Sequence, residues 1–130
     1  MSTRLALPKH VLTASATAAD TRSRQIQPGV REVEVIGVTT DANDWITLPS
    51  LAQVPNGTAI RILCNAGANF ELRTPAGSNE ETNSEDSDGT KEYLCTDTQL
   101  VIATKVNNTI GWEVHGYTQI GAVATAVVPD

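Results

Sequence analysis

The feature that most constrains the fold is a period-two alternation of apolar and other residues between Val54 and His115, cut repeatedly by Gly, Asn and Pro. Successive side chains of a β-strand point to opposite faces of the sheet, so this alternation predicts strands with one buried face. The 130 residues are the length of one domain. The sequence therefore predicts a single all-β domain in which helix is nearly absent.

The alternation is most regular between Thr58 and Thr74, where we predict a hairpin. If its loop is Ala66-Gly67-Ala68, Cys64 opposes Phe70 and Ile62 opposes Leu72, which places the apolar residues on one face. Gly67 can take the positive φ that a bulged three-residue loop needs. The hairpin is expected to end at Pro75, which lacks a ladder donor.

The rest of the chain contains shorter segments of the same kind. Val and Thr are abundant, which favours strands, and turn residues separate the segments. The polar segments Thr39–Asp44 and Ser78–Thr90 are predicted to be loops. We predict further strands at Arg31–Val38, Trp45–Leu48, Lys91–Thr96, Leu100–Val106, Gly111–Tyr117 and Ile120–Val128. We expect the buried core to include Ile60, Ile62, Cys64, Phe70, Leu72, Leu100, Ile102, Trp112 and Val114.

The beginning of the chain differs from the rest in charge. Residues 1–31 carry five basic side chains and one acidic side chain, a net of +4, whereas residues 32–130 carry four basic and fourteen acidic ones, a net of −10. We predict an extended basic N-terminal arm over residues 1–30 and a β-sandwich domain over residues 31–130, with the arm lying on an acidic neighbour. Nucleic acid is the rival partner, but the charges form no helical stripe and lack stacking aromatics. The basic residues expected to make the arm's contacts are Arg4, Lys9, Arg22 and Arg24.

The first residues are not expected to be an export signal. Ala14-Ser15-Ala16 resembles a cleavage site, but Lys9 and His10 interrupt the preceding apolar run. No stretch approaches the roughly 20 apolar residues of a membrane-spanning helix. Cytoplasmic synthesis is therefore expected, and with it Cys64 and Cys95 as reduced, buried thiols rather than a disulfide.

The sequence contains no motif of a known catalytic or cofactor site. His10 and His115 lie far apart without metal-ligand spacing, and two cysteines alone do not make a zinc site. Residues 84–89, SEDSDG, resemble a calcium loop, but the twelfth position would be Cys95 where a carboxylate is required. We predict a protein that is not an enzyme, with no cofactor and no metal, and leave open a weak cation site in the acidic loop at residues 80–88.

The succession of turn motifs, G-T-x-I-x-I, G-A-N, R-T-P-A-G and a late G-W, resembles a β-sandwich module of tailed-bacteriophage virion proteins. The whole chain, with its Ala/Val-rich end, looks most like head decoration (cement) proteins. Where that pattern has a small or apolar residue before the third strand, this chain has the acidic NSEDSDG. The matching positions are Gly57, Ile60, Ile62, Gly67, Ala68, Asn69, Pro75, Ala76, Gly77, Asn83, Gly111 and Trp112.

The resemblance implies an antiparallel, jelly-roll-like β-sandwich on the outer surface of a virion. It also implies a structural protein that binds the outside of a phage capsid and stabilises the expanded head by bridging capsid subunits. Its partners would be the major capsid protein and its own copies, with no nucleic acid and no membrane. We expect a homotrimer, because a local three-fold point of an icosahedral head offers three equivalent patches. A dimer on two-fold points remains open.

The same module is also familiar from phage fibres and appendages. The alternative function is therefore recognition of a host receptor or glycan. The aromatic side chains that could stack on a sugar are Trp45, Tyr93, Trp112 and Tyr117, and we expect Trp112 to serve as core instead.

Overall fold

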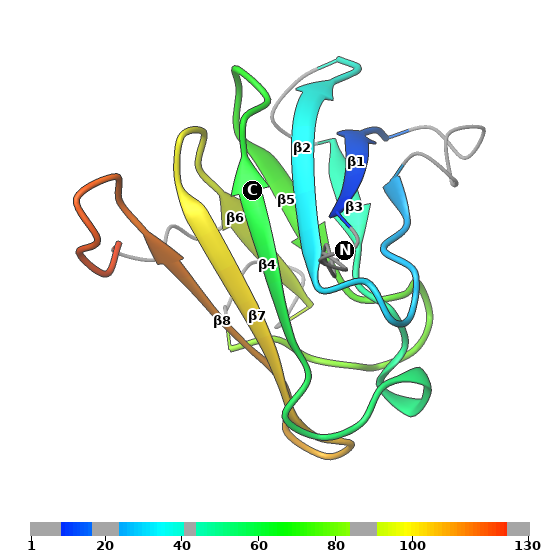
Figure 1. The fold of residues 1–130 in the computed structure, drawn as a ribbon. Coiled ribbons are helices and arrows are strands. Elements are labelled where there is room, and N and C mark those ends of the chain that lie inside the picture. Colours follow the sequence, from blue (N-terminus) through cyan, green and yellow to red (C-terminus); the bar gives the residue numbers. More distant parts are fainter. Residues whose placement is uncertain (1–8, 17–23, 41–43, 84–90, 125–130) are drawn as a thin grey trace, which may run out of the picture.

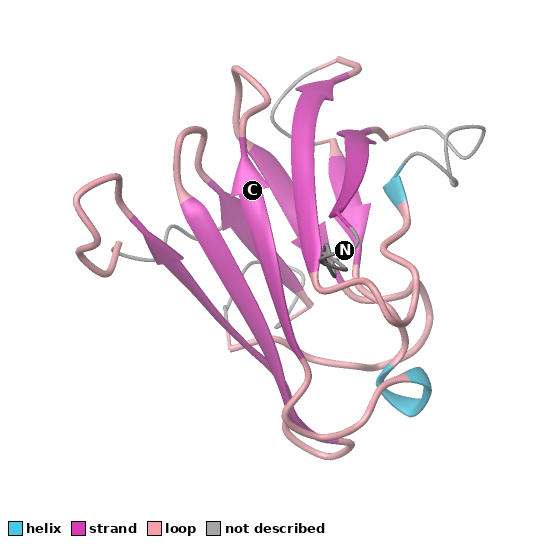
Figure 2. Cartoon of the chain, viewed as in Figure 1, coloured by secondary structure: helices cyan, strands magenta, loops and turns pink. Residues whose placement is uncertain are grey.

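The computed structural model describes residues 9–16, 24–40, 44–83 and 91–124. These residues form an all-β fold of two sheets, as predicted, with helix confined to short turns such as η2 (Leu51–Gln53) (Figures 1 and 2). The strands are β1 (Lys9–Ala14), β2 (Glu32–Val38), β3 (Trp45–Thr47), β4 (Ala59–Cys64), β5 (Phe70–Arg73), β6 (Glu92–Cys95), β7 (Leu100–Asn107) and β8 (Gly111–Tyr117).

The larger sheet has the strand order β1-β2-β4-β7-β8, and the smaller has the order β3-β5-β6. Both sheets are mixed rather than antiparallel throughout, because β1 and β2, β2 and β4, and β3 and β5 run parallel. Parallel neighbours need a crossover connection. Between β2 and β4 the chain makes this crossover by passing through β3 in the other sheet (Figure 1).

The hairpin predicted over residues 58–74 is wrong. β4 pairs with β2 and β7, whereas β5 pairs with β3 and β6, so the loop around Gly67 carries the chain from one sheet to the other. Gly67 does take a positive φ, +73°. The alternation correctly showed that Ile62 and Phe70 face one core, but they reach it from opposite sheets.

The shared core contains most of the residues predicted for it. Seven of the nine are buried, including Phe70, Leu72 and Trp112. Leu100 and Ile102 are only partly buried, because β7 turns Val101 and Ala103 inward instead. The seven buried residues are Ile60, Ile62, Cys64, Phe70, Leu72, Trp112 and Val114.

The side chain of Lys105 accounts for the orientation of β7, in which Val101 and Ala103 point into the core. Its position continues the inward-facing series of Val101 and Ala103, and its side chain is buried. The Nζ donates hydrogen bonds to the backbone carbonyls of Leu51 (2.6 Å) and Val54 (2.7 Å). A buried ammonium is tolerated only when it is hydrogen-bonded, and here it ties the loop around η2 to the sheet.

Part of the predicted arm belongs to the larger sheet. Residues 9–14 are extended, as expected, but they form β1, and Leu12 and Ala14 are buried in the core. Ile26 is also completely buried, and its N–H donates to the carbonyl of Thr47 at 2.9 Å. In the part of the chain that is described, the division at residue 30 therefore does not separate an arm from the domain.

Two segments cover the outer edge of β8, and the sequence did not predict this role for either of them. The Asn83 side chain imitates a peptide group: its Oδ1 accepts from the N–H of Val114 (2.5 Å) and its Nδ2 donates to the same residue's carbonyl (3.0 Å). The N–H of Trp112 donates to the carbonyl of Glu81 at 2.9 Å. Residues 78–83 are thus not simply a solvated loop.

The second covering segment is the C-terminal stretch, predicted as a strand over Ile120–Val128. In residues 120–124 it makes only one isolated bridge, between Val123 and Tyr117, and an N–H of Ala124 donates to the carbonyl of Gly116 at 2.8 Å. Residues 125–128 lie outside the described part. With Asn83, this segment satisfies backbone groups along β8 that would otherwise be open to strand pairing.

The Asp44 carboxylate accepts hydrogen bonds from Thr39 and Thr40, and these bonds imply that stability depends on pH. Burial by itself raises the pKa of this carboxyl, but hydrogen bonds from the Thr40 N–H (2.6 Å) and the hydroxyls of Thr40 (2.7 Å) and Thr39 (2.9 Å) outweigh burial, so its pKa lies below the ordinary 3.8. A lowered native pKa stabilises the fold above the unfolded-state value, and this stability is lost as the pH falls through the native value.

We expect Asp44→Asn to destabilise the protein at pH 7, and the difference from the wild type to shrink below about pH 4. Asparagine keeps the shape of the side chain but lacks its charge. Urea unfolding at pH 7, 5 and 3 measures the difference in free energy. A difference that stays the same at all three values would contradict the assigned role of the carboxylate.

Candidate functional site

The outward face of the larger sheet carries two rows of side chains defined by strand register. One row runs through Leu63, Leu100 and Tyr117 on β4, β7 and β8. The next row runs through Arg61, Ile102 and His115. Side chains two residues apart on one strand point to the same face, so Ile102 lies beside Leu100 on β7 and forms an apolar patch with the first row.

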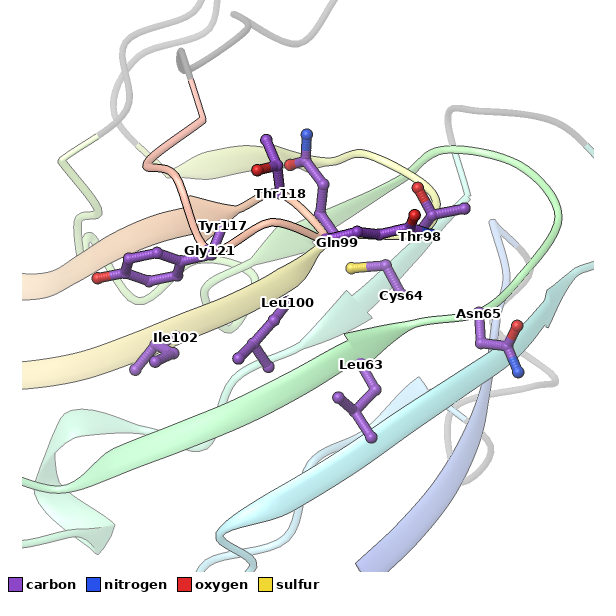
Figure 3. Close-up of a pocket in the computed structure, with 11 residues that line it drawn as sticks. Leu63, Cys64, Asn65, Thr98, Gln99, Leu100, Ile102, Tyr117, Thr118 and Gly121 are labelled. Atoms are coloured by element: carbon purple, nitrogen blue, oxygen red, sulfur yellow. The ribbon is translucent and has the colours of Figure 1, made fainter.

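This patch lines a hollow of about 640 Å³, which we call the apolar hollow (Figure 3). Leu63, Leu100, Ile102 and Tyr117 are all partly exposed in it. Polar groups from the loops at this end of the sheet complete the wall. They are Asn65, Thr98, Gln99, Thr118 and Gln119, and Cys64 and Gly121 also contribute.

Backbone strain occurs at the wall of the apolar hollow. Thr98 has a φ of +70°, an unfavourable conformation for a β-branched residue. The turn is held by the Thr98 N–H, which donates to the carbonyl of Cys64 at 2.8 Å, and by the Gln99 N–H, which donates to the carbonyl of Thr96 at 3.2 Å. Such strain often accompanies binding surfaces, which makes the apolar hollow the leading candidate for a contact site.

The sequence contains a pattern that indicates the apolar hollow, although a search for period-two alternation does not detect it. Residues 100–103, LVIA, are apolar without interruption. A strand with only one buried face alternates, so an unbroken run means that both faces are apolar. Val101 and Ala103 supply the core face, and Leu100 and Ile102 supply the outward face that lines the apolar hollow.

The four basic residues predicted to make contacts are not brought together as one group. Arg4 and Arg22 lie outside the described residues. Lys9 is on the outward face of β1, where its Nζ forms a 3.0 Å ion pair with Glu34. Arg24 is only 9% exposed and is packed against Trp45.

Arg24 and Arg73 flank the indole ring of Trp45. Each guanidinium carbon lies 4.2 Å from the ring centroid. Arg24 comes from the chain that bridges to one side of β3, at Gln25 and Thr47, and Arg73 comes from β5 on the other side. A second pocket, of about 340 Å³, opens beside this stack, and we call it the stacked pocket.

The structure accounts for the aromatic side chains considered for sugar stacking. Trp112 and Tyr93 are buried, with 1% and 3% exposure. Trp45 is flanked by its two arginines. Tyr117 lines the apolar hollow and is partly exposed, which leaves it as the aromatic candidate among the four that could meet a sugar ring.

The cysteines are both buried and free, Cys64 in β4 and Cys95 in β6. Burial raises the pKa of the Cys95 thiol well above its ordinary value, and the neighbouring Cys64 thiol raises it further. In the described residues, no three His, Cys, Asp or Glu side chains are grouped so that they could hold a metal ion. Residues 84–89, which resemble a calcium loop, lie outside the described part.

No helix among the described residues is long and apolar enough to cross a membrane. The fold and its surface together define an all-β domain of two mixed sheets with an apolar hollow at one end of the larger sheet. Searches against protein-family models, curated proteins and solved structures find no match to this chain.

Proposed function

We propose that the protein is a structural component of a phage virion that binds the outside of the capsid and stabilises the expanded head by bridging its subunits. The observation that supports this most is the apolar hollow. An apolar face with a strained polar wall suits contact with another protein surface. In this proposal the two-sheet domain is a variant of the β-sandwich module of virion proteins, and it acts without catalysis.

The proposal includes a homotrimer in which the apolar hollow takes part in the subunit contact. Next to it stand Ile120, 91% exposed, and Val123, 68% exposed. Around a three-fold axis one patch of each subunit meets a different patch of the next. Ile120 of one copy entering the apolar hollow of its neighbour would cover both apolar surfaces at once.

Three single variants test the trimer. We expect Ile102→Glu and Ile120→Glu to shift the protein from trimer to monomer, because each places a charge in a desolvated contact. Ile110→Glu is the matched control, since Ile110 is 54% exposed at the β7–β8 turn and does not line the apolar hollow. Analytical ultracentrifugation measures the mass, and circular dichroism checks that each variant is folded. A wild-type monomer, or dissociation by Ile110→Glu alone, would contradict the proposed contact.

Binding to heads tests the function itself. Purified protein is mixed with undecorated, expanded phage heads and imaged by electron microscopy. Density on local three-fold points is expected, and the two trimer-disrupting variants are expected to lose it, because linked subunits bind together more strongly than single ones. The second candidate, host glycan recognition, is favoured by Tyr117 in the apolar hollow. Binding to host cells without binding to heads would select that candidate.

A further inference from the structure

The stacked pocket contains a buried positive charge without an ionic partner in the described residues. Arg24 is 9% exposed, and its Nη1 donates one hydrogen bond, of 2.8 Å, to the backbone carbonyl of Ser15. Its other contact is the Trp45 ring. No acidic side chain of the described residues forms an ion pair with it. Buried charges are normally paired, because desolvation penalises an isolated ion.

The other arginine of the stack has its own partners. Arg73 forms ion pairs with Glu71 and with Glu92, the second at 3.4 Å, and its Nε donates to Glu71 Oε2 at 2.6 Å. Lys91 is exposed at the wall of the same pocket. Among the described residues, three cations therefore face two carboxylates, which leaves one positive charge at this pocket in a protein whose net charge is −6.

We propose that the stacked pocket binds a carboxylate group, with Arg24 as its principal ligand and Lys91 as a second cation. A guanidinium offers donors in a plane that matches a carboxylate, and stacking on Trp45 fixes the orientation of that plane. A single negative charge balances the local excess. A dianionic phosphate would also meet the neighbouring carboxylates of Glu71 and Glu92, so a monovalent carboxylate is the better match.

The size of the pocket limits the ligand to a small acid or an acidic side chain of another protein. The volume of about 340 Å³ is at the lower end of ligand pockets. The polar groups of Gln25, Thr47 and Thr74 also line it and can bond to the atoms that carry the carboxylate. This site lies beside the smaller sheet and is distinct from the apolar hollow, so the proposal does not depend on the capsid function.

Four probes test the ligand chemistry on the full chain. N-acetylglutamate amide is titrated against its neutral isostere N-acetylglutamine amide, with propionate and inorganic phosphate alongside. The readout is the indole N–H resonance of Trp45 in a nitrogen-15 correlated NMR spectrum, assigned with Trp45→Phe, and the buried Trp112 indole serves as the internal control. A saturable shift with the glutamate probe and not with its isostere is expected. Tighter binding than propionate indicates a protein side chain as the source, and equal binding indicates a free small acid.

Three variants distinguish binding in the stacked pocket from nonspecific electrostatic attraction of an anion to the protein. Arg24→Gln is expected to weaken binding about tenfold or more, because a charge-assisted hydrogen bond is lost. Lys91→Gln, at an exposed position that leaves the fold intact, is expected to weaken it severalfold, and Arg61→Gln, on the exposed face of β4, to leave it within about twofold.

Three outcomes would overturn the proposal. The first is an equal shift by the neutral isostere, and the second is an equal loss of binding in Arg24→Gln and Arg61→Gln. The third is the absence of any shift with all four probes.

Discussion

Replacing Phe70 with alanine is expected to lower the free energy of unfolding by about 3–5 kcal/mol. Phe70 is the chain's single phenylalanine, it lies in β5, and it is completely buried between the two sheets. Its ring fills space that the short strands of the smaller sheet cannot close by moving, because β5 is held on one side by β3 and on the other by β6. The cost therefore includes a cavity as well as lost transfer energy.

Urea unfolding at pH 7 measures this loss. Ile36→Ala is the comparison, because Ile36 is 51% exposed on β2 and its truncation is expected to cost less than about 1 kcal/mol. Circular dichroism should show the same strand content in both variants before unfolding. A loss below 1 kcal/mol for Phe70→Ala would mean that the sheets do not pack on this side chain.

Gly111→Ala is expected to cost at least about 3 kcal/mol, from left-handed backbone strain and a lost hydrogen bond. Gly111 has a φ of +90°, and a Cβ at this position would collide with the backbone carbonyl of Glu81. That carbonyl accepts the N–H of Trp112 at 2.9 Å. Relieving the collision would move the segment that covers β8 and leave a buried donor unpaired.

Gly57→Ala separates the collision from the backbone strain. Gly57 has a φ of +84°, close to that of Gly111, but no atom lies within 4 Å of an added Cβ. Its substitution is expected to cost about 1–2 kcal/mol, the strain alone. Thermal unfolding followed by circular dichroism compares the two variants. Equal losses would show that the contact with Glu81 yields easily and that Gly111 is needed only for its φ.

Local patterns predicted where most strands lie, but not which strands pair. The alternation around Ile62 and around Phe70 identified two strands with inward apolar faces, and both are present. It could not show that they belong to different sheets, since a loop around Gly67 can either close a hairpin or cross between layers. The difference depends on contacts with β2 and β7, which are distant in sequence.

The local sequence pattern also could not predict which face of β7 is buried, because that face is decided by contacts with residues distant in sequence. A prediction that buries the larger apolar side chains of β7 places Leu100 and Ile102 in the core. In that orientation Lys105 would face outward. The chain does the reverse, because Lys105 finds two backbone carbonyls that its Nζ can reach. Those acceptors lie 54 and 51 residues away in sequence.

The two candidate sites were predicted to different degrees. The apolar run at Leu100–Ala103 is visible in the sequence and indicates a second apolar face, once both sides of the strand are considered. The stacked pocket has no comparable signal. Arg24, Trp45 and Arg73 come from separate segments, and nothing in their spacing shows that one indole lies between two guanidinium groups.

One edge strand of the larger sheet is covered and the other is open, and this difference limits how copies of the protein can join that sheet into a continuous one. In the described residues, β8 is covered by Asn83 and by residues 122–124, whereas no strand pairs with the outer side of β1. Endless end-to-end polymerisation through sheet edges needs two open and complementary edges on every copy. In the larger sheet, with β1 as its one open edge, a second copy could extend the sheet only through its own β1, and that pairing would close on itself. The larger sheet is therefore unable to act as a template for a fibre, even where many copies lie close together.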